Sequence, residues 1–152
     1  MEKETETNKQ AFDFIKRFSS FESALRLTDT VRKERNANII WDDVKKILKT
    51  KNFKLTDEQK EFEIFKNPPK KLKFENVLSW ELGPISTNEE DLVIDVLVRV
   101  RNNLFHGSKH FGDSSESQRN RTLIDDALVV LSSVVKHVGV EDAYEDVLSY
   151  WS

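Results

Sequence analysis

The residues best suited to chemistry lie close together in the segment VRVRNNLFHGSKH. Arg101 offers a rigid guanidinium fork that grips phosphate oxygens. His106 carries an imidazole that can take up or release a proton near neutral pH. Asn102 lies four residues before His106, which puts both residues on one face of a helix. A cation, an amide and an imidazole at this spacing can assist cleavage of a phosphodiester by a neighbouring 2′-hydroxyl.

Basic and polar residues surround these three. The segment 99–121 holds five basic and two acidic residues, although the net charge of the whole chain is −3. Such a run on an acidic chain can guide a polyanion. A second run, five lysines between Val44 and Leu55 with no acid among them, is more often a solvated helix face. The candidates for contacts with substrate are Arg99, Asn103, Lys109 and His110.

Two further sets of residues bear on the site. Glu22 stands beside a row of phenylalanines and either pairs with Arg101 or faces solvent, the commoner fate of a glutamate. His106 and His110 have the i,i+4 spacing that can bind zinc on a helix. However, Gly107 is expected to end that helix and no third ligand is evident. We therefore predict no metal and no cofactor.

Apolar residues at helical spacing predict an all-α fold, a helical bundle of four to six helices. Short alternation of apolar and polar residues around Glu75-Asn76 allows a small β-hairpin near 71–81. Capping-box spacings at Thr56 and Thr87 predict helix starts, and Gly139 is expected to end a helix. We expect residues 1–7 to be frayed and flexible. The expected helices span 8–27, 40–49, a short stretch after 56, 88–106, 117–138 and 140–150.

The composition fits one domain over residues 1–152. Four Gly and three Pro are too few for a turn-rich sandwich or barrel. Cysteine is absent, which excludes disulfides and fits a reducing cytoplasm. The first ten residues are too polar for a signal peptide, and no apolar run approaches the ~18 residues of a spanning helix. We therefore expect a cytoplasmic protein with no membrane association.

Several segments accompany the motif along the chain. They are FIKRFSSFESAL in the first expected helix, Trp41, NPPKK and LSW. Together with RNNLFHG they resemble one branch of the HEPN superfamily, known from plasmid and other mobile-element proteins. The resemblance extends from about Phe12 to Leu131, and the Arg–polar–x3–His spacing at its centre is the signature of that superfamily.

The resemblance implies a HEPN-like bundle that cleaves RNA without a metal ion, with Arg101, Asn102 and His106 as catalytic residues. It also implies a toxin or defence RNase, with an antitoxin or defence partner protein beside RNA. HEPN proteins pair two motifs across a dimer. His106 lies five positions after Arg101, roughly 140° around a helix, and one histidine cannot act as base and acid in the same step. We therefore expect a homodimer with a composite site.

Two alternatives stay open. Some HEPN domains only bind RNA, a nucleotide or a partner protein, and such a module would carry the same fold. An Arg-x4-His spacing also occurs in ordinary structural helices, with the arginine on the wet face and the histidine near the end. Cleavage of RNA by the wild type but not by a His106→Ala variant would separate the first hypothesis from both alternatives.

Overall fold

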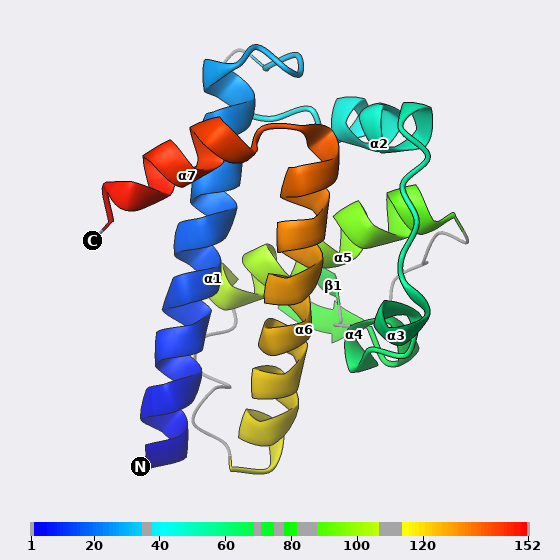
Figure 1. Cartoon of the computed structure of the whole chain (residues 1–152). Coiled ribbons are helices and arrows are strands. Elements are labelled where there is room, and N and C mark those ends of the chain that lie inside the picture. Colours follow the sequence, from blue (N-terminus) through cyan, green and yellow to red (C-terminus); the bar gives the residue numbers. More distant parts are fainter. Residues whose placement is uncertain are drawn as a thin grey trace.

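Seven helices and one two-stranded hairpin make up the described part of the chain (Figure 1). The computed structural model describes residues 2–34, 38–68, 71–74, 78–81, 88–106 and 114–151, and the side chains of 8–34, 38–68, 88–104 and 119–151. The elements are α1 (Glu2–Leu27), α2 (Trp41–Thr50), α3 (Asp57–Lys60), α4 (Glu63–Lys66), β1 (Lys71–Phe74), β2 (Leu78–Glu81), α5 (Glu89–His106), α6 (Ser114–Val138) and α7 (Glu141–Ser149).

The two long helices α1 and α6 lie side by side and run in the same direction (Figure 1). The short α7 returns from the end of α6 and packs across α1. Helix α5 crosses behind α6, with its C-terminal end beside α1, while α2 packs on α5 and α6. This crossing brings the end of α5, where the motif lies, against the middle of the longest helix.

The core is formed by the apolar stripes that the sequence predicts. On α1 the phenylalanines at 14, 18 and 21 are almost fully buried. Helices α5 and α6 contribute mainly β-branched and leucine side chains to the core, and α7 contributes the buried Tyr144. The predicted all-α bundle is confirmed. The best-buried members on the three long helices include Phe14, Phe18, Phe21, Leu25, Val93, Ile94, Val96, Leu97, Ile124, Ala127, Leu131 and Val134.

Two helices begin earlier than the sequence predicts. Helix α1 starts at Glu2 rather than at residue 8, whereas fraying of residues 1–7 stays a prediction. Acidic residues alternate through this first stretch, where they favour the positive end of the helix dipole. Helix α6 starts at Ser114 rather than at residue 117, because residues expected to form a cap-rich loop continue the helix.

The third expected helix is divided in two, which raises the helix count above the predicted range. Thr56 and Gln59 form the predicted capping box. The backbone N–H of Thr56 donates to Oε1 of Gln59 at 3.0 Å, and the backbone N–H of Gln59 donates to Oγ1 of Thr56 at 3.1 Å. The chain then becomes extended at Phe62 and begins a second single turn. Asp126 of α6 accepts a hydrogen bond from the backbone N–H of Ile64 at 3.2 Å, so a tertiary contact caps this turn. Because Asp126 is distant from Ile64 in the sequence, no local pattern predicts this contact.

The predicted small β-hairpin and the predicted helix end at Gly139 are both confirmed. Strands β1 and β2 pair antiparallel, with Leu72 opposite Trp80. Their expected turn at Glu75-Asn76 lies outside the described residues, as does the expected cap at Thr87. Gly139 follows α6 with φ of +88° and donates to the carbonyl of Val135 at 3.2 Å, a conformation that favours glycine.

Within the part of the chain that the structure describes, no helix combines the length and apolar composition needed to cross a lipid bilayer.

Val96 tests whether α5 is central to the bundle. Its side chain is 2% exposed, so a Val96→Asp variant would bury an unpaired charge and lose at least about 3 kcal/mol of stability. Val129 of α6 is 49% exposed and provides the matched control, because Val129→Asp places the same charge in water. Urea unfolding of both variants measures the difference. Equal stabilities would contradict this packing.

Candidate functional site

The last two turns of α5 carry the motif. Four of the predicted site residues lie here with half-buried side chains: Arg99, Arg101, Asn102 and Asn103. The helix ends at His106, so that residue lies at the negative end of the helix dipole. Its side chain lies outside the described residues, as do the predicted contacts Lys109 and His110.

Arg101 is held by contacts on several sides. Its Nη1 donates a hydrogen bond to Oδ1 of Asn102 at 3.1 Å. Its guanidinium carbon lies 5.9 Å from the centre of the Phe18 ring, within cation–π range. Its Nη2 lies 3.9 Å from Oε1 of Glu22, so the ion pair considered from the sequence is present. Since each contact restricts the long side chain, the fork is positioned before any ligand arrives.

Glu22 is the buried member of this group. Its side chain is 12% exposed, and its second oxygen lies 3.7 Å from Nη2 of Arg26. Burial raises the pKa of Glu22 above its usual value of 4.5, and the positive charges of Arg101 and Arg26 oppose that rise. A carboxylate kept in such a place lowers stability when it is charged. The solvent-facing alternative for Glu22 is therefore wrong.

Helical spacing explains why these groups meet. Phe18, Glu22 and Arg26 follow one another every four residues, so they form a stripe along one side of α1. The end of α5 packs against α1 and brings Arg101 onto that stripe. The sequence pointed to Glu22 but not to Arg26. The i,i+4 order of glutamate before arginine was the signal available, because this order favours an ion pair on a helix.

The arrangement suits recognition of a phosphate. The Arg101 side chain is 37% exposed, so part of the fork can meet a ligand while its inner face lies on the core aromatic Phe18. Asn102 already accepts from Arg101 through its oxygen, which directs its amide donors elsewhere. Position 106 lies one turn later on the same side of α5 as Asn102. A cation, an amide and a histidine position therefore occupy one end of α5.

Three of the five lysines in the second basic run contact neighbouring helices. Lys45 lies 2.7 Å from Asp95, and Lys49 lies 3.2 Å from Asp91, so acids of α5 pair with lysines of α2. Lys51 donates to the carbonyl of Val138 at 2.9 Å at the end of α6. These lysines fasten α2 to its neighbours. The sequence favours a solvated helix face for this run, and four of its lysines are exposed, namely Lys46, Lys49, Lys51 and Lys54.

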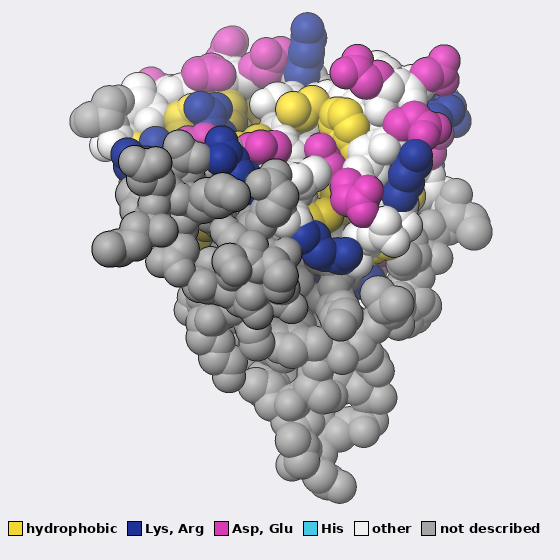
Figure 2. All heavy atoms as spheres, turned by 90° about the horizontal axis from the view of Figure 1, so that it is seen from below, with side chains coloured by type: hydrophobic (Ala, Val, Ile, Leu, Met, Phe, Trp, Pro, Cys, Tyr) yellow, Lys and Arg dark blue, Asp and Glu magenta, His cyan; other side chains and the backbone are white. Residues whose placement is uncertain are grey.

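Charges of both signs are mixed over the described surface seen in Figure 2, with no single-sign patch across that view. An open hollow of about 530 Å³ lies beside α2. Arg32 in its lining donates a hydrogen bond to Asp43 at 2.8 Å, and this contact lowers the pKa of Asp43 to about 2. The hollow does not include the motif. It is lined by Asp29, Thr30, Val31, Arg32, Lys33, Asp43, Lys46 and Ile47.

Among the side chains that the structure describes, no three of the histidines, aspartates and glutamates gather as metal ligands would. The zinc spacing of His106 and His110 falls outside those side chains, so it stays untested.

Comparison of the chain with protein families, with curated proteins and with solved structures gave no match in any of the three. The resemblance to HEPN proteins therefore depends on the motif and its flanking segments.

The burial of Glu22 predicts a definite pH dependence. Well below pH 4.5 the residue is protonated in the folded and unfolded chains alike, and as the pH rises through this value the unfolded chain loses the proton first. The wild type should therefore lose stability relative to Glu22→Gln as the pH rises from 4 to 7. Urea unfolding of both proteins across this range measures the change.

Glu61 supplies a control of opposite sign. Its hydrogen bond with Lys66 lowers its pKa, so the wild type should gain stability relative to Glu61→Gln as the pH rises. The change should be small because the pair is exposed to solvent. If the stability difference between wild type and Glu22→Gln stays constant with pH, or changes in favour of the wild type as the pH rises, a destabilising carboxylate at position 22 is contradicted.

Proposed function

We propose that this chain is a HEPN-type endoribonuclease that cleaves RNA without a metal ion and acts as a homodimer in the cytoplasm. The observation that carries the proposal is the setting of Arg101. This motif residue is held half-exposed at the end of α5 by Asn102, Phe18 and the mostly buried Glu22. An arginine that only keeps the surface hydrated needs no buried carboxylate beside it. A phosphate-binding arginine benefits from such a carboxylate, because the ion pair fixes the position of the guanidinium group.

The reaction proposed is an internal transfer. The 2′-oxygen attacks phosphorus, the bond to the 5′-oxygen breaks, and the products carry a 2′,3′-cyclic phosphate and a 5′-hydroxyl. One histidine accepts the proton of the 2′-hydroxyl and another donates a proton to the leaving 5′-oxygen. Arg101 stabilises the negative charge that develops on the equatorial oxygens. Asn102 orients the phosphate or the imidazole.

A dimer provides the second histidine. Each chain contributes one His106, which cannot serve as base and acid in a single step. A two-fold axis near the end of α5 would bring two copies of Arg101, Asn102 and His106 into one cleft. Arg99, Asn103, Lys109 and His110 would then contact phosphates on either side of the cut. The dimer follows from this chemical need together with the resemblance.

The proposed setting is conflict between a host and a mobile element, with the enzyme as a toxin or defence RNase. An antitoxin or another defence protein would restrain it, since an unrestrained RNase harms its own cell. The alternative is a HEPN module that binds RNA, a nucleotide or a partner without cleaving. The fixed position of Arg101 is compatible with binding alone, so product formation is the discriminating measurement.

Cleavage should persist in EDTA and leave 2′,3′-cyclic phosphate ends, which mass spectrometry of the products identifies. Arg101→Ala should lower kcat roughly 100-fold by removing transition-state stabilisation. His106→Ala should lower it by a similar factor and flatten the pH profile near neutrality. DNA, or RNA with a 2′-O-methyl group at the cut site, should resist.

Lys46→Ala is the matched control, because this exposed lysine belongs to the second basic run. Its rate should equal that of the wild type. Products with 5′-phosphates and activity that EDTA abolishes would indicate a metal nuclease and refute the assignment. RNA binding without cleavage, unchanged by His106→Ala, would favour the non-catalytic module.

Mixing wild-type and inactive chains tests the composite site. Wild-type protein unfolded and refolded with an excess of His106→Ala chains should lose more activity than dilution alone predicts, because each heterodimer has only one of the two histidines that the reaction needs. Sedimentation of the wild type at micromolar concentration should show a dimer. A monomer that cleaves RNA, or activity that falls only in proportion to dilution although heterodimers form, would exclude the shared site.

A further inference from the structure

One carboxylate holds two arginines from different helices. Oε1 of Glu22 faces Arg101 of α5 at 3.9 Å, and Oε2 faces Arg26 of α1 at 3.7 Å. The two arginine side chains are 37% and 33% exposed, whereas Glu22 is 12% exposed. The guanidinium groups are therefore neighbours across a largely buried acid, and both reach the surface.

Glu22 holds the two arginines near each other. The like charges of Arg26 and Arg101 repel, and the carboxylate that both contact offsets this repulsion. Burial raises the pKa of Glu22, and the positive charges of Arg101 and Arg26 oppose that rise, so the two arginines favour the charged acid that draws them together. The result is a pair of guanidinium forks held side by side before a ligand binds.

We propose that Arg26 is a second phosphate-binding residue of the RNA site, held next to Arg101 by their shared contact with Glu22. The inference rests on the proposed function, since it takes Arg101 to grip the phosphate at the cut. Arginine forks recognise phosphate oxygens through paired hydrogen bonds. An RNA strand offers such a group at every nucleotide, so a neighbouring arginine binds a neighbouring phosphate. Arg26 therefore contributes to RNA affinity rather than to the chemical step.

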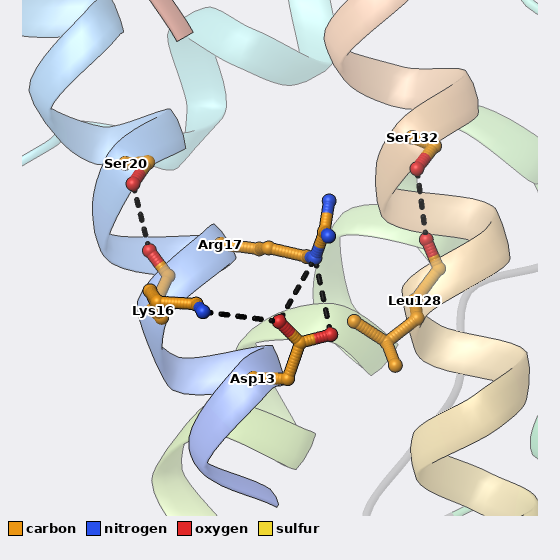
Figure 3. A network of polar contacts seen from close by, with 6 residues as sticks. All are labelled: Asp13, Lys16, Arg17, Ser20, Leu128 and Ser132. Carbon is orange, nitrogen blue, oxygen red and sulfur yellow. Dashed lines mark hydrogen bonds and ion pairs between the residues drawn. The ribbon is translucent and has the colours of Figure 1, made fainter. Parts of the chain in front are cut away.

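A similar group elsewhere on α1 supplies the control (Figure 3). Asp13 contacts both Lys16 and Arg17, at 3.6 and 3.1 Å. The Arg17 side chain is 36% exposed, close to the value for Arg26. This group contains no residue of α5, and its acid is 34% exposed. Arg17→Gln thus removes an equally exposed, ion-paired arginine from the same helix without touching Arg101.

The test measures binding of a fluorescent single-stranded RNA that carries 2′-O-methyl groups throughout and so resists cleavage. Anisotropy titrations at several salt concentrations compare wild type, Arg26→Gln, Arg26→Lys and Arg17→Gln. Arg26→Gln should weaken binding about tenfold and reduce the slope of log affinity against log salt by about 0.7. Arg26→Lys should recover part of both. Arg17→Gln should match the wild type.

Cleavage of unmodified RNA is measured in parallel. Arg26→Gln should raise KM and leave kcat within about twofold of the wild type, as expected for uniform binding. Thermal melting shows whether each variant is folded, and Arg26→Lys serves in place of Arg26→Gln if the latter is not.

The outcomes separate the two proposals. Unchanged affinity and salt slope in folded Arg26 variants, or equal losses in Arg17→Gln, overturn the role of Arg26 and leave cleavage by the wild type unaffected. A wild type that binds RNA through Arg26 but yields no cleavage product overturns the nuclease and retains the phosphate site. A wild type without measurable affinity for the RNA overturns the phosphate site as well.

Discussion

The side chains of Phe14, Phe18 and Phe21 on α1 are almost fully buried, and the neighbouring helices are arranged around them. Burying each ring contributes about 2 kcal/mol, so α5 and α6 must cover this stripe. The ring centre of Phe18 lies 5.3 Å from that of Trp41 at the start of α2, and the Arg101 guanidinium lies over the same Phe18 ring. Glu22 comes one helical turn after Phe18, at the edge of the same stripe. Packing of the core therefore places the Glu22 carboxylate at a largely buried position and brings Arg101 to 3.9 Å from it.

Electrostatic contacts orient α5 at both ends. Toward its start, acids of α5 pair with Lys45 and Lys49 of α2. Toward its end, Arg101 turns to Glu22 of α1. Exposed pairs of this kind add little stability individually, but their distribution fixes which side of the helix faces which neighbour. The motif is thus presented at the junction of α1 and α5.

Features with a local cause could be predicted from the sequence, and features with a tertiary cause could not. Periodicity predicted the long helices, and Thr56 and Gly139 marked helix ends through their own backbone chemistry. The division after α3 depends on Asp126, which is distant in the chain. Glu22 was recognised as a candidate, but its link to Arg26 and Arg101 together requires knowing which face of α1 meets α5. The partners of Lys45 and Lys49 could not be predicted either, because these acids lie on another helix.

The burial of Glu22 has an evolutionary consequence. Selection for folding alone would replace a desolvated carboxylate by glutamine or an apolar residue, since either removes an unfavourable charge from a nearly dry position. A lineage that no longer needed Arg101 would be free to accept that change. Under the proposed function, Glu22 is retained at some cost in stability because it positions Arg101. Homologues that lose this function should replace Glu22 sooner than the core phenylalanines.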